Sequence, residues 1–208
     1  MTESDKETAD VLCEFFKSVF INDSNLASPE NKLQMLRAPE IVSPSQCFSR
    51  NSVLQKLHRL QPDKSPGPDD VHPMLLKKCA DVLAEPLSII FQQSYASGHL
   101  PADWKSANVV AIFKKGKRGD VSNYRPVSLT SVPCKVMESL LKDELTKYLE
   151  TTSTLSKVQH GFCQGRSCLT NLLDAFEAWS LALDQGYGID VVCLDYRKVS
   201  IQFGTADY

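Results

Sequence analysis

Asp195 is the carboxylate whose place in the sequence points most directly to chemistry, because it ends the apolar run IDVVCLD at residues 189–195. The β-branched residues of this run predict a strand that is buried on both faces. A carboxylate at the carboxyl end of such a strand would face a cleft, where it could hold a divalent cation together with substrate phosphates. The alternative is that Asp195 caps a turn after the strand, which is the more common role of an aspartate at such a position.

Six cations crowd into the 21 residues from 105 to 125, and one carboxylate, Asp120, interrupts them. Like charges on one loop repel each other, so their clustering indicates that the loop binds a polyanion, with phosphate as the natural ligand. A solvated turn is the alternative interpretation. The six residues are Lys105, Lys114, Lys115, Lys117, Arg118 and Arg125.

Two glycine-containing loops differ in what they could bind. The loop KSPGPD (64–69) is not a phosphate-binding P-loop, because it lacks the Gly-Lys-Ser/Thr ending and follows no strand. Its two prolines leave few backbone N–H groups for an anion, so we predict a rigid turn. In QHGFCQGRS (159–167), Gly161 and Gly165 allow tight turns, and Arg166 would point its donors at an anion from the start of the next helix. The alternative is an ordinary loop that leads into a helix.

The overall composition excludes several classes of protein. With 42% hydrophobic residues, 23% charged residues and a net charge of -2, the 208-residue chain is neither disordered nor a bulk nucleic-acid binder of the histone type. No apolar run reaches the length of a membrane span, and the polar, acidic start MTESDKETAD is not a signal peptide. We therefore expect an intracellular protein, in the nucleus or cytoplasm, that is not secreted and has no membrane partner.

Seven cysteines are scattered along the chain without a Cys-x-x-Cys pair, and their number is odd. This pattern argues against a disulfide framework and against a four-thiolate zinc site. We expect a reducing compartment in which most of the thiols pack as small core side chains. His160 has no second His or Cys at metal-ligand spacing, so we predict that it is a core or loop residue.

Apolar spacing along the chain predicts mostly helices, with a few short strands. Helical periodicity covers residues 7–20, 50–60, 74–95, 135–149 and 169–183. We expect the third of these helices to break or kink at Pro86 and to end at Gly98. Two strands, at residues 108–113 and 126–130, are predicted to form a hairpin with a basic tip.

Taken in order, four segments resemble the front half of a reverse transcriptase from a non-LTR (LINE-type) retrotransposon, most of all those of the CR1/jockey-like elements. They are KSPGPDDVHPMLLKKCA (64–80), the stretch from GHLPADW to VMESLL (98–141), QHGFCQGRSCLTNLL (159–173) and VVCLDYRKVS (191–200). EFFKSVF (14–20) also resembles the segment that links endonuclease and polymerase in such elements. The run NYRPVSLTSVPCKVME (123–138) is the most specific part, because so long an ordered match does not arise by chance.

The resemblance implies an α+β, right-hand polymerase fold, in which the fingers come first along the chain and the palm follows. On this basis we expect a mostly helical molecule with a short fingers hairpin. Residues 1–49 would form an N-terminal helix and linker, residues 50–200 a partial reverse transcriptase domain with the fingers and the start of the palm, and residues 201–208 an unrelated tail.

The resemblance also implies roles for individual residues. Lys114 and Arg125 match the fingers residues that hold the triphosphate of the incoming dNTP, and Asp195 matches the first palm carboxylate, which binds catalytic Mg²⁺. The implied reaction is nucleotidyl transfer onto a primer paired with an RNA or DNA template, with two metal ions on the attacking and leaving oxygens. The residues that would contact the template are Gly161, Phe162, Gly165, Arg166, Lys115, Lys117 and Arg118.

The sequence departs from the family pattern after LDYRK (194–198). The family usually continues with Ala-Phe-Asp, whereas this chain has Val199, Ser200 and Ile201. Ser200 replaces the aromatic residue that excludes the 2′-hydroxyl of a ribonucleotide. The paired palm aspartates lie further along the chain in the family and have no counterpart in this sequence. We therefore expect a fold truncated after the first catalytic palm strand, and a chain that is inactive by itself.

Two functions of different classes stay open at this point, and with them the question of whether the chain is an enzyme. The first is a truncated RNA-directed DNA polymerase domain of a retrotransposon. The second is a non-catalytic remnant that binds nucleic acid or a protein partner. A salt-sensitive affinity for RNA through the basic hairpin would favour nucleic-acid binding, because phosphate contacts weaken as salt rises.

Overall fold

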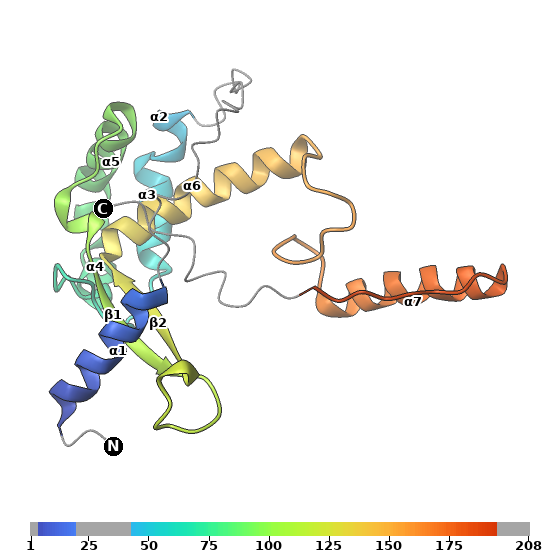
Figure 1. Ribbon diagram of the computed structural model, residues 1–208. Coiled ribbons are helices and arrows are strands. Elements are labelled where there is room, and N and C mark those ends of the chain that lie inside the picture. The colour runs from blue at the N-terminus through green and yellow to red at the C-terminus, as the bar shows by residue number, and fades with distance from the viewer. Residues whose placement is uncertain (1–3, 20–42, 195–208) are drawn as a thin grey trace, which may run out of the picture. The chain divides into compact units, whose positions relative to one another are not determined.

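The computed structural model describes residues 4–19 and 43–194 (Figure 1). Asp195, Ser200, the tail 201–208 and most of the expected linker lie outside the described residues. The described residues form two compact units, one that runs up to Leu145 and a second that covers residues 146–194. Each unit is described by itself.

The first unit contains most of the helices and the hairpin. Its elements are α1 (Asp5–Val19), α2 (Pro44–Cys47), α3 (Arg50–His58), α4 (Pro73–Lys78), α5 (Ala80–Ser97), the short 3-10 helix η2 (Ala102–Lys105), β1 (Ala107–Phe113), the 3-10 helix η3 (Val121–Asn123), β2 (Tyr124–Thr130) and the first part of α6 (Val132–Thr151). The second unit contains the end of α6 and α7 (Cys168–Asp184). In the described part of the chain, no helix is long and apolar enough to cross a membrane.

The core of the first unit forms where α3 packs against α5 and the start of α6 covers both. The prediction of a helix from residue 50 is confirmed, and the Ser49 side chain caps that helix by accepting a hydrogen bond from the Ser52 N–H at 3.2 Å. Aromatic rings fill the centre, because Phe91 packs at 6.0 Å from Phe48 and at 5.7 Å from Trp104, edge to face in both cases. The fully buried side chains at this centre include Phe48, Phe91, Leu57 and Val53.

Of the expected break or kink at Pro86, the break is wrong. The helical region divides at Cys79 instead, where α4 ends and α5 begins, and α5 runs without interruption through Pro86 to Ser97. A proline leaves the carbonyl four residues earlier without its helical partner, here that of Val82. Val82 lies on the solvent side of α5 and is 76% exposed, while α5 packs against α3 and continues past the proline. The predicted end at Gly98 is confirmed, since Gly98 takes the left-handed conformation with φ 66°.

The predicted hairpin is confirmed, and side chains on both of its faces are largely exposed. β1 and β2 pair antiparallel from Ala107 opposite Thr130 to Phe113 opposite Tyr124. Val109, Val110 and Ile112 remain exposed on the strand surfaces. The hairpin joins the helical core at its base, where β2 leads directly into α6, and α1 contacts η3 at its other end.

The expectation that most of the thiols pack in the core is wrong, because only Cys47 and Cys134 are buried among the six cysteines of residues 43–194. For Cys47 and Cys134 the prediction holds, and burial also raises the pKa of both thiols. Burial, with Glu144 and Asp143 nearby, raises the pKa of the Cys47 thiol to about 11. Burial beside Glu138 raises the pKa of Cys134 to about 11 in the same way.

The second unit confirms one predicted element and contradicts another. α7 matches the helix predicted at residues 169–183. The expected buried strand at the end of the chain is wrong over its described part, because residues 189–194 have no regular structure and Val191, Val192 and Leu194 are exposed. A strand exists only through its hydrogen-bonded neighbours, and the sheet in the described residues contains β1 and β2 alone.

A candidate nucleic-acid interface on the fingers hairpin

The turn between β1 and β2 carries most of the cations that the sequence predicted. We call residues 114–123 the basic loop. Figure 1 shows it at the end of the hairpin that is remote from α6. The side chains of Lys114, Lys115, Lys117 and Arg118 are all exposed there. Their charges are therefore presented to solvent at the tip of a two-stranded arm.

An aromatic pair at the base of the basic loop holds Arg118. The rings of Phe113, the last residue of β1, and Tyr124, the first residue of β2, lie 5.5 Å apart in an edge-to-face contact. The Arg118 guanidinium lies over the Phe113 ring, with Cζ 5.4 Å from the ring centroid. The Tyr124 hydroxyl donates a hydrogen bond to the Arg118 carbonyl at 3.0 Å. Backbone and side chain of Arg118 are thus both fixed by the pair.

Asn123 fixes the other side of the basic loop. Its side-chain amide donates to the Lys117 carbonyl at 3.0 Å, and its own carbonyl accepts from the Lys114 N–H at 2.8 Å. Gly116 faces this amide with φ 93°, and a Cβ at that position would lie 2.7 Å from Asn123 Nδ2. Only glycine suits both the conformation and the space. The loop is therefore held in one shape before any ligand arrives.

Asp120 is the one carboxylate of the basic loop, and it serves the backbone. Its Oδ1 accepts from the Ser122 N–H at 2.9 Å and so caps the short helix η3. Hydrogen bonds from the Ser122 hydroxyl and backbone N–H lower the pKa of Asp120. Asp120 forms no ion pair with a cation of the described residues.

The local charge of this region contrasts with that of the whole chain. Residues 114–125 contain five cations and one carboxylate, a formal charge of +4 in a chain whose net charge is -2. None of the five cations lies within 4.0 Å of a carboxylate oxygen of any described residue. Unpaired cations that are held close together on a stiffened loop repel one another, and a polyanionic ligand would relieve this repulsion.

The strand register brings Lys114 and Arg125 to one face of the hairpin. Arg125 lies opposite Ile112 in the ladder, so the two side chains share a face. The bond from the Lys114 N–H to the Asn123 carbonyl extends the pairing by one residue beyond Phe113. Because faces alternate with every residue, Lys114 returns to the face of Ile112 and Arg125. Two cations that were predicted to hold the same triphosphate therefore lie on the same side.

The other four expected template residues lie in the second unit, on the loop before α7. Phe162 is fully exposed and has φ 60°, a left-handed conformation that is unusual for a bulky side chain. Arg166 donates from Nη1 to the carbonyls of Lys157 and Gln159, so its guanidinium holds the loop together. Gly165 has φ 72°, whereas a Cβ on Gly161 would meet only the Gln159 amide at 3.6 Å.

His160 has a role that its sequence context did not reveal. Its Nδ1 shares a 3.0 Å hydrogen bond with the Thr170 hydroxyl, and its Nε2 lies 3.1 Å from Asp174 Oδ2. Both partners belong to α7, so the imidazole fastens the loop to the first turns of that helix. The sequence could have indicated this pair of partners, because residues 170 and 174 are four apart and share a helix face.

No metal site is present in residues 4–19 and 43–194, where no three His, Cys, Asp or Glu side chains lie close enough to hold an ion. Asp195, the expected metal ligand, lies outside the described residues. The residues that the structure describes therefore do not fit a Mg²⁺ site by themselves.

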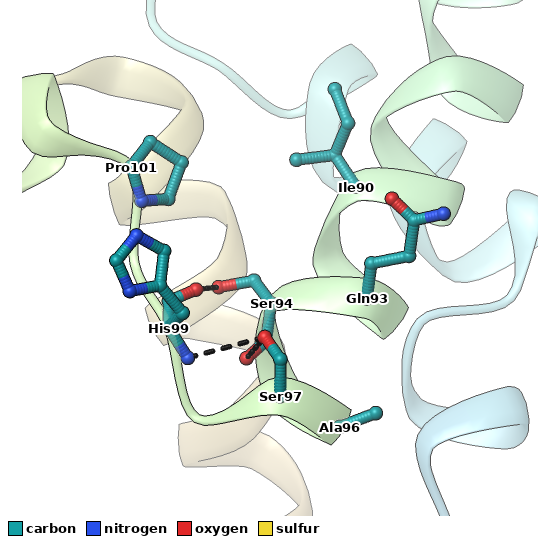
Figure 2. Close-up of a pocket in the computed structure, with 7 residues that line it drawn as sticks. All are labelled: Ile90, Gln93, Ser94, Ala96, Ser97, His99 and Pro101. Carbon is teal, nitrogen blue, oxygen red and sulfur yellow. Dashed lines mark hydrogen bonds between the residues drawn. The ribbon is translucent and has the colours of Figure 1, made fainter.

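A hollow at the end of α5 lies apart from the predicted site residues. It encloses about 630 Å³ and is lined by residues between Ile90 and Pro101 (Figure 2). Its polar groups are used within the fold: the Ser94 hydroxyl donates to the His99 carbonyl at 2.7 Å, and the His99 N–H donates to the Ser97 hydroxyl. No lysine, arginine or carboxylate of the described residues lines it. It therefore adds nothing to the interface on the hairpin.

Comparison with known proteins tests the resemblance that the sequence suggested. The chain is 32% identical over 131 residues to the RNA-directed DNA polymerase from mobile element jockey of Drosophila melanogaster, and 28% identical over 131 residues to that of Drosophila funebris. It is 27% identical over 119 residues to the Pol polyprotein from the type-1 retrotransposable element R1 of Bradysia coprophila. The resemblance to retrotransposon reverse transcriptases is confirmed.

The matches cover part of this chain and a small part of each relative. The two jockey matches cover 62% of this chain and the R1 match covers 56%. The chain itself spans 14% of the length of each jockey polymerase and 12% of the R1 polyprotein. No family model matches the chain. A mixed, mostly helical molecule with a small antiparallel hairpin fits a polymerase fold in general terms.

Proposed function

We propose that this chain supplies the fingers and the start of the palm of a retrotransposon reverse transcriptase, within residues 50–200. The observation that carries the proposal is the basic loop, whose exposed cations have no carboxylate partner among the described residues. A loop of this kind binds phosphates without reading bases. The relationship to RNA-directed DNA polymerases supports nucleic acid and dNTP as the source of those phosphates.

The hairpin would divide its cations between two ligands. Lys114 and Arg125 share one face, which supports a common contact with the triphosphate of the incoming dNTP. Arginine can grip two phosphate oxygens with its planar fork, while lysine acts as a point charge. Lys115, Lys117 and Arg118 would contact template phosphates from the tip of the loop. Because the loop is held in shape beforehand, binding costs little ordering entropy.

The loop before α7 would shape the path of the template. Phe162, fully exposed in a left-handed conformation, offers an aromatic surface beside Gly161, and Gly165 permits the next turn. Arg166 would act mainly by holding this loop, since it already donates to two backbone carbonyls. Its role as a template contact stays a prediction.

Catalysis would require more than the described residues hold. Two-metal nucleotidyl transfer needs several carboxylates around the ions, and the resemblance supplies one, Asp195. We propose that the 208-residue chain binds primer and template without extending the primer. A primer-extension assay with a primed RNA template and Mg²⁺ tests this. We expect no product above that of the Asp195→Asn variant, and a clear excess over that variant would overturn the proposal.

Removal of the loop cations tests the binding function. We expect Lys114, Lys115, Lys117 and Arg118 changed together to Ala to raise the dissociation constant of a labelled single-stranded RNA by at least about 100-fold at 0.1 M salt. Each lost phosphate contact costs about fivefold under these conditions. Fluorescence anisotropy measures the change.

A matched control separates loop contacts from overall charge. Changing the exposed lysines Lys6, Lys78, Lys142 and Lys147 to Ala removes the same four charges elsewhere. We expect this control to weaken binding by less than about fivefold, because long-range charge is largely screened. Equal losses in the two quadruple variants would show that the basic loop is not the binding site.

Binding that survives the loop substitutions would favour the second candidate function, a protein-binding remnant. One observation supports that candidate directly, because α7 exposes a stripe of large apolar side chains along one side. The stripe consists of Leu169, Leu172, Leu173, Phe176 and Leu183.

A further inference from the structure

The proline-rich loop between α3 and α4 is rigid, and the nucleic-acid interface leaves it without a role. Pro66 and Pro68 each fix a backbone torsion on either side of Gly67. The Asp70 N–H donates to the Gly67 carbonyl at 3.2 Å and closes a turn, with Asp70 itself at φ 53°. The Asp69 side chain accepts from the Val71 N–H at 3.4 Å. The loop is thus set in one conformation by its own bonds.

Gly67 touches the backbone at which the hairpin joins the helical core. Gly67 is buried, and a Cβ on it would lie 2.6 Å from the carbonyl carbon and oxygen of Thr130 and from the Ser131 nitrogen. These are main-chain atoms, which cannot rotate away as a flexible side chain could. Any residue larger than glycine must therefore push the loop and the end of β2 apart.

The contacted junction is fixed on the side of the helix. Ser131 is fully buried, its carbonyl accepts from the Lys135 N–H at 3.1 Å, and its hydroxyl accepts from the Cys134 N–H at 3.4 Å. The first turns of α6 that follow contribute Val132 and Val136 to the core. A displacement at Thr130 is therefore passed to β2 rather than to α6.

The hairpin would transmit such a displacement to the basic loop. β1 and β2 pair over seven residues each, which is a length of about 20 Å from Thr130 to Tyr124. Both faces of the hairpin are largely exposed, so apart from the contact of α1 with η3 at its far end, contact at its base sets its direction. A tilt of about 10° at the base would move the loop by about 3–4 Å over such a length.

We infer that Gly67 is a positioning residue for the basic loop: its bare backbone lets the proline-rich loop seat against Thr130 and Ser131 and so sets the angle of the hairpin. The inference rests on the proposed binding function for its consequence, which is that the loop cations meet successive phosphates only at this angle. The seating itself rests on the contacts of Gly67 alone.

The Gly67→Ala variant tests the inference against Gly98→Ala. Gly98 has φ 66°, and no atom lies within 4 Å of the point that an added Cβ would occupy, so alanine there strains the end of α5 without touching the hairpin. At a temperature where both variants are folded, we expect Gly67→Ala to weaken RNA binding about fivefold or more and Gly98→Ala to leave it unchanged. One lost phosphate contact also lowers the log–log salt dependence by about 0.7.

Hydrogen exchange measures the seating without RNA. We expect the amides of β2 to exchange faster in Gly67→Ala than in Gly98→Ala. The amides of α5 should exchange faster in Gly98→Ala than in Gly67→Ala. Should Gly67→Ala not fold, the double change Pro66→Ala and Pro68→Ala loosens the same loop without a clash, and the same order is expected.

Three outcomes are distinguishable. Weaker RNA binding and faster β2 exchange in Gly67→Ala alone support the inference. Unchanged RNA binding and equal β2 exchange in the two variants overturn it, because a merely structural glycine would lower stability and nothing else. A wild-type chain that binds no RNA would contradict the proposed function, while β2 exchange would still decide whether Gly67 seats the hairpin.

Discussion

The two units of this chain hold their helices by different means. In the first unit, α3, α5 and α6 bury a shared set of apolar side chains around Phe48 and Phe91. In the second, no residue from 146 to 194 is buried, and α7 is held by local hydrogen bonds. The main ones are the capping box of Ser167 and Thr170 and the hydrogen bond between His160 and Thr170. Burial stabilises the first unit, whereas the second has apolar surface left to cover.

The same contrast separates the two loops that the function needs. The basic loop is stiffened by neutral groups, the Phe113–Tyr124 pair and the Asn123 amide, and its lysines remain unpaired among the described residues. The loop before α7 is held by its own arginine, because Arg166 donates to backbone carbonyls. Apart from Arg118, whose guanidinium lies over Phe113, the cations of the basic loop are not used to build it and are available for phosphate.

The largest expected effect tests burial directly. Phe91→Ala should lower the free energy of unfolding by about 3–5 kcal/mol, because it empties the centre of the core. Phe176→Ala should cost less than about 1 kcal/mol, because that ring is 52% exposed and packs mainly on Trp179 at 5.4 Å. Urea unfolding monitored by circular dichroism measures both. Similar losses in the two variants would mean that α7 is as well packed as the core.

A smaller effect comes from the helix caps, which are chemically alike in the two units. Ser49→Ala should lower the stability of the first unit by about 1 kcal/mol, since its hydroxyl accepts from the Ser52 N–H. Ser167→Ala removes an equivalent bond to the Thr170 N–H. We expect it to speed hydrogen exchange in α7 and to leave the unfolding of the core unchanged. A loss of core stability in Ser167→Ala would show that the units unfold together.

Local patterns in the sequence predicted the parts of the fold that depend on local physics. The hairpin, the helix from residue 50 and α7 follow from periodicity, turn residues and caps, all within a few positions of one another. The break expected at Pro86 does not occur, because the packing of α5 against α3, which joins residues remote in sequence, also determines where the helix ends. The strand expected at residues 189–194 failed because pairing partners are remote in sequence.

The candidate site was predictable to a similar degree. The cations of the loop and their phosphate chemistry could be read from composition, because clustered like charges need no tertiary information. The ring pair that holds Arg118 and the face shared by Lys114 and Arg125 required the register of the strands. The contact of Gly67 with the Thr130 backbone joins residues more than sixty positions apart, so no local pattern could show it.

The salt dependence of RNA binding tests most directly the claim that the basic loop holds phosphates. For single-stranded RNA the slope of log K against log salt is about −0.7 for each phosphate neutralised. Without dNTP, Lys114 is available to RNA together with Lys115, Lys117 and Arg118, and four contacts predict a slope of about −3. Changing Lys114, Lys115, Lys117 and Arg118 to Ala should bring that slope close to zero, while the matched change of Lys6, Lys78, Lys142 and Lys147 should leave it near −3. A slope that is the same in both variants would contradict the account.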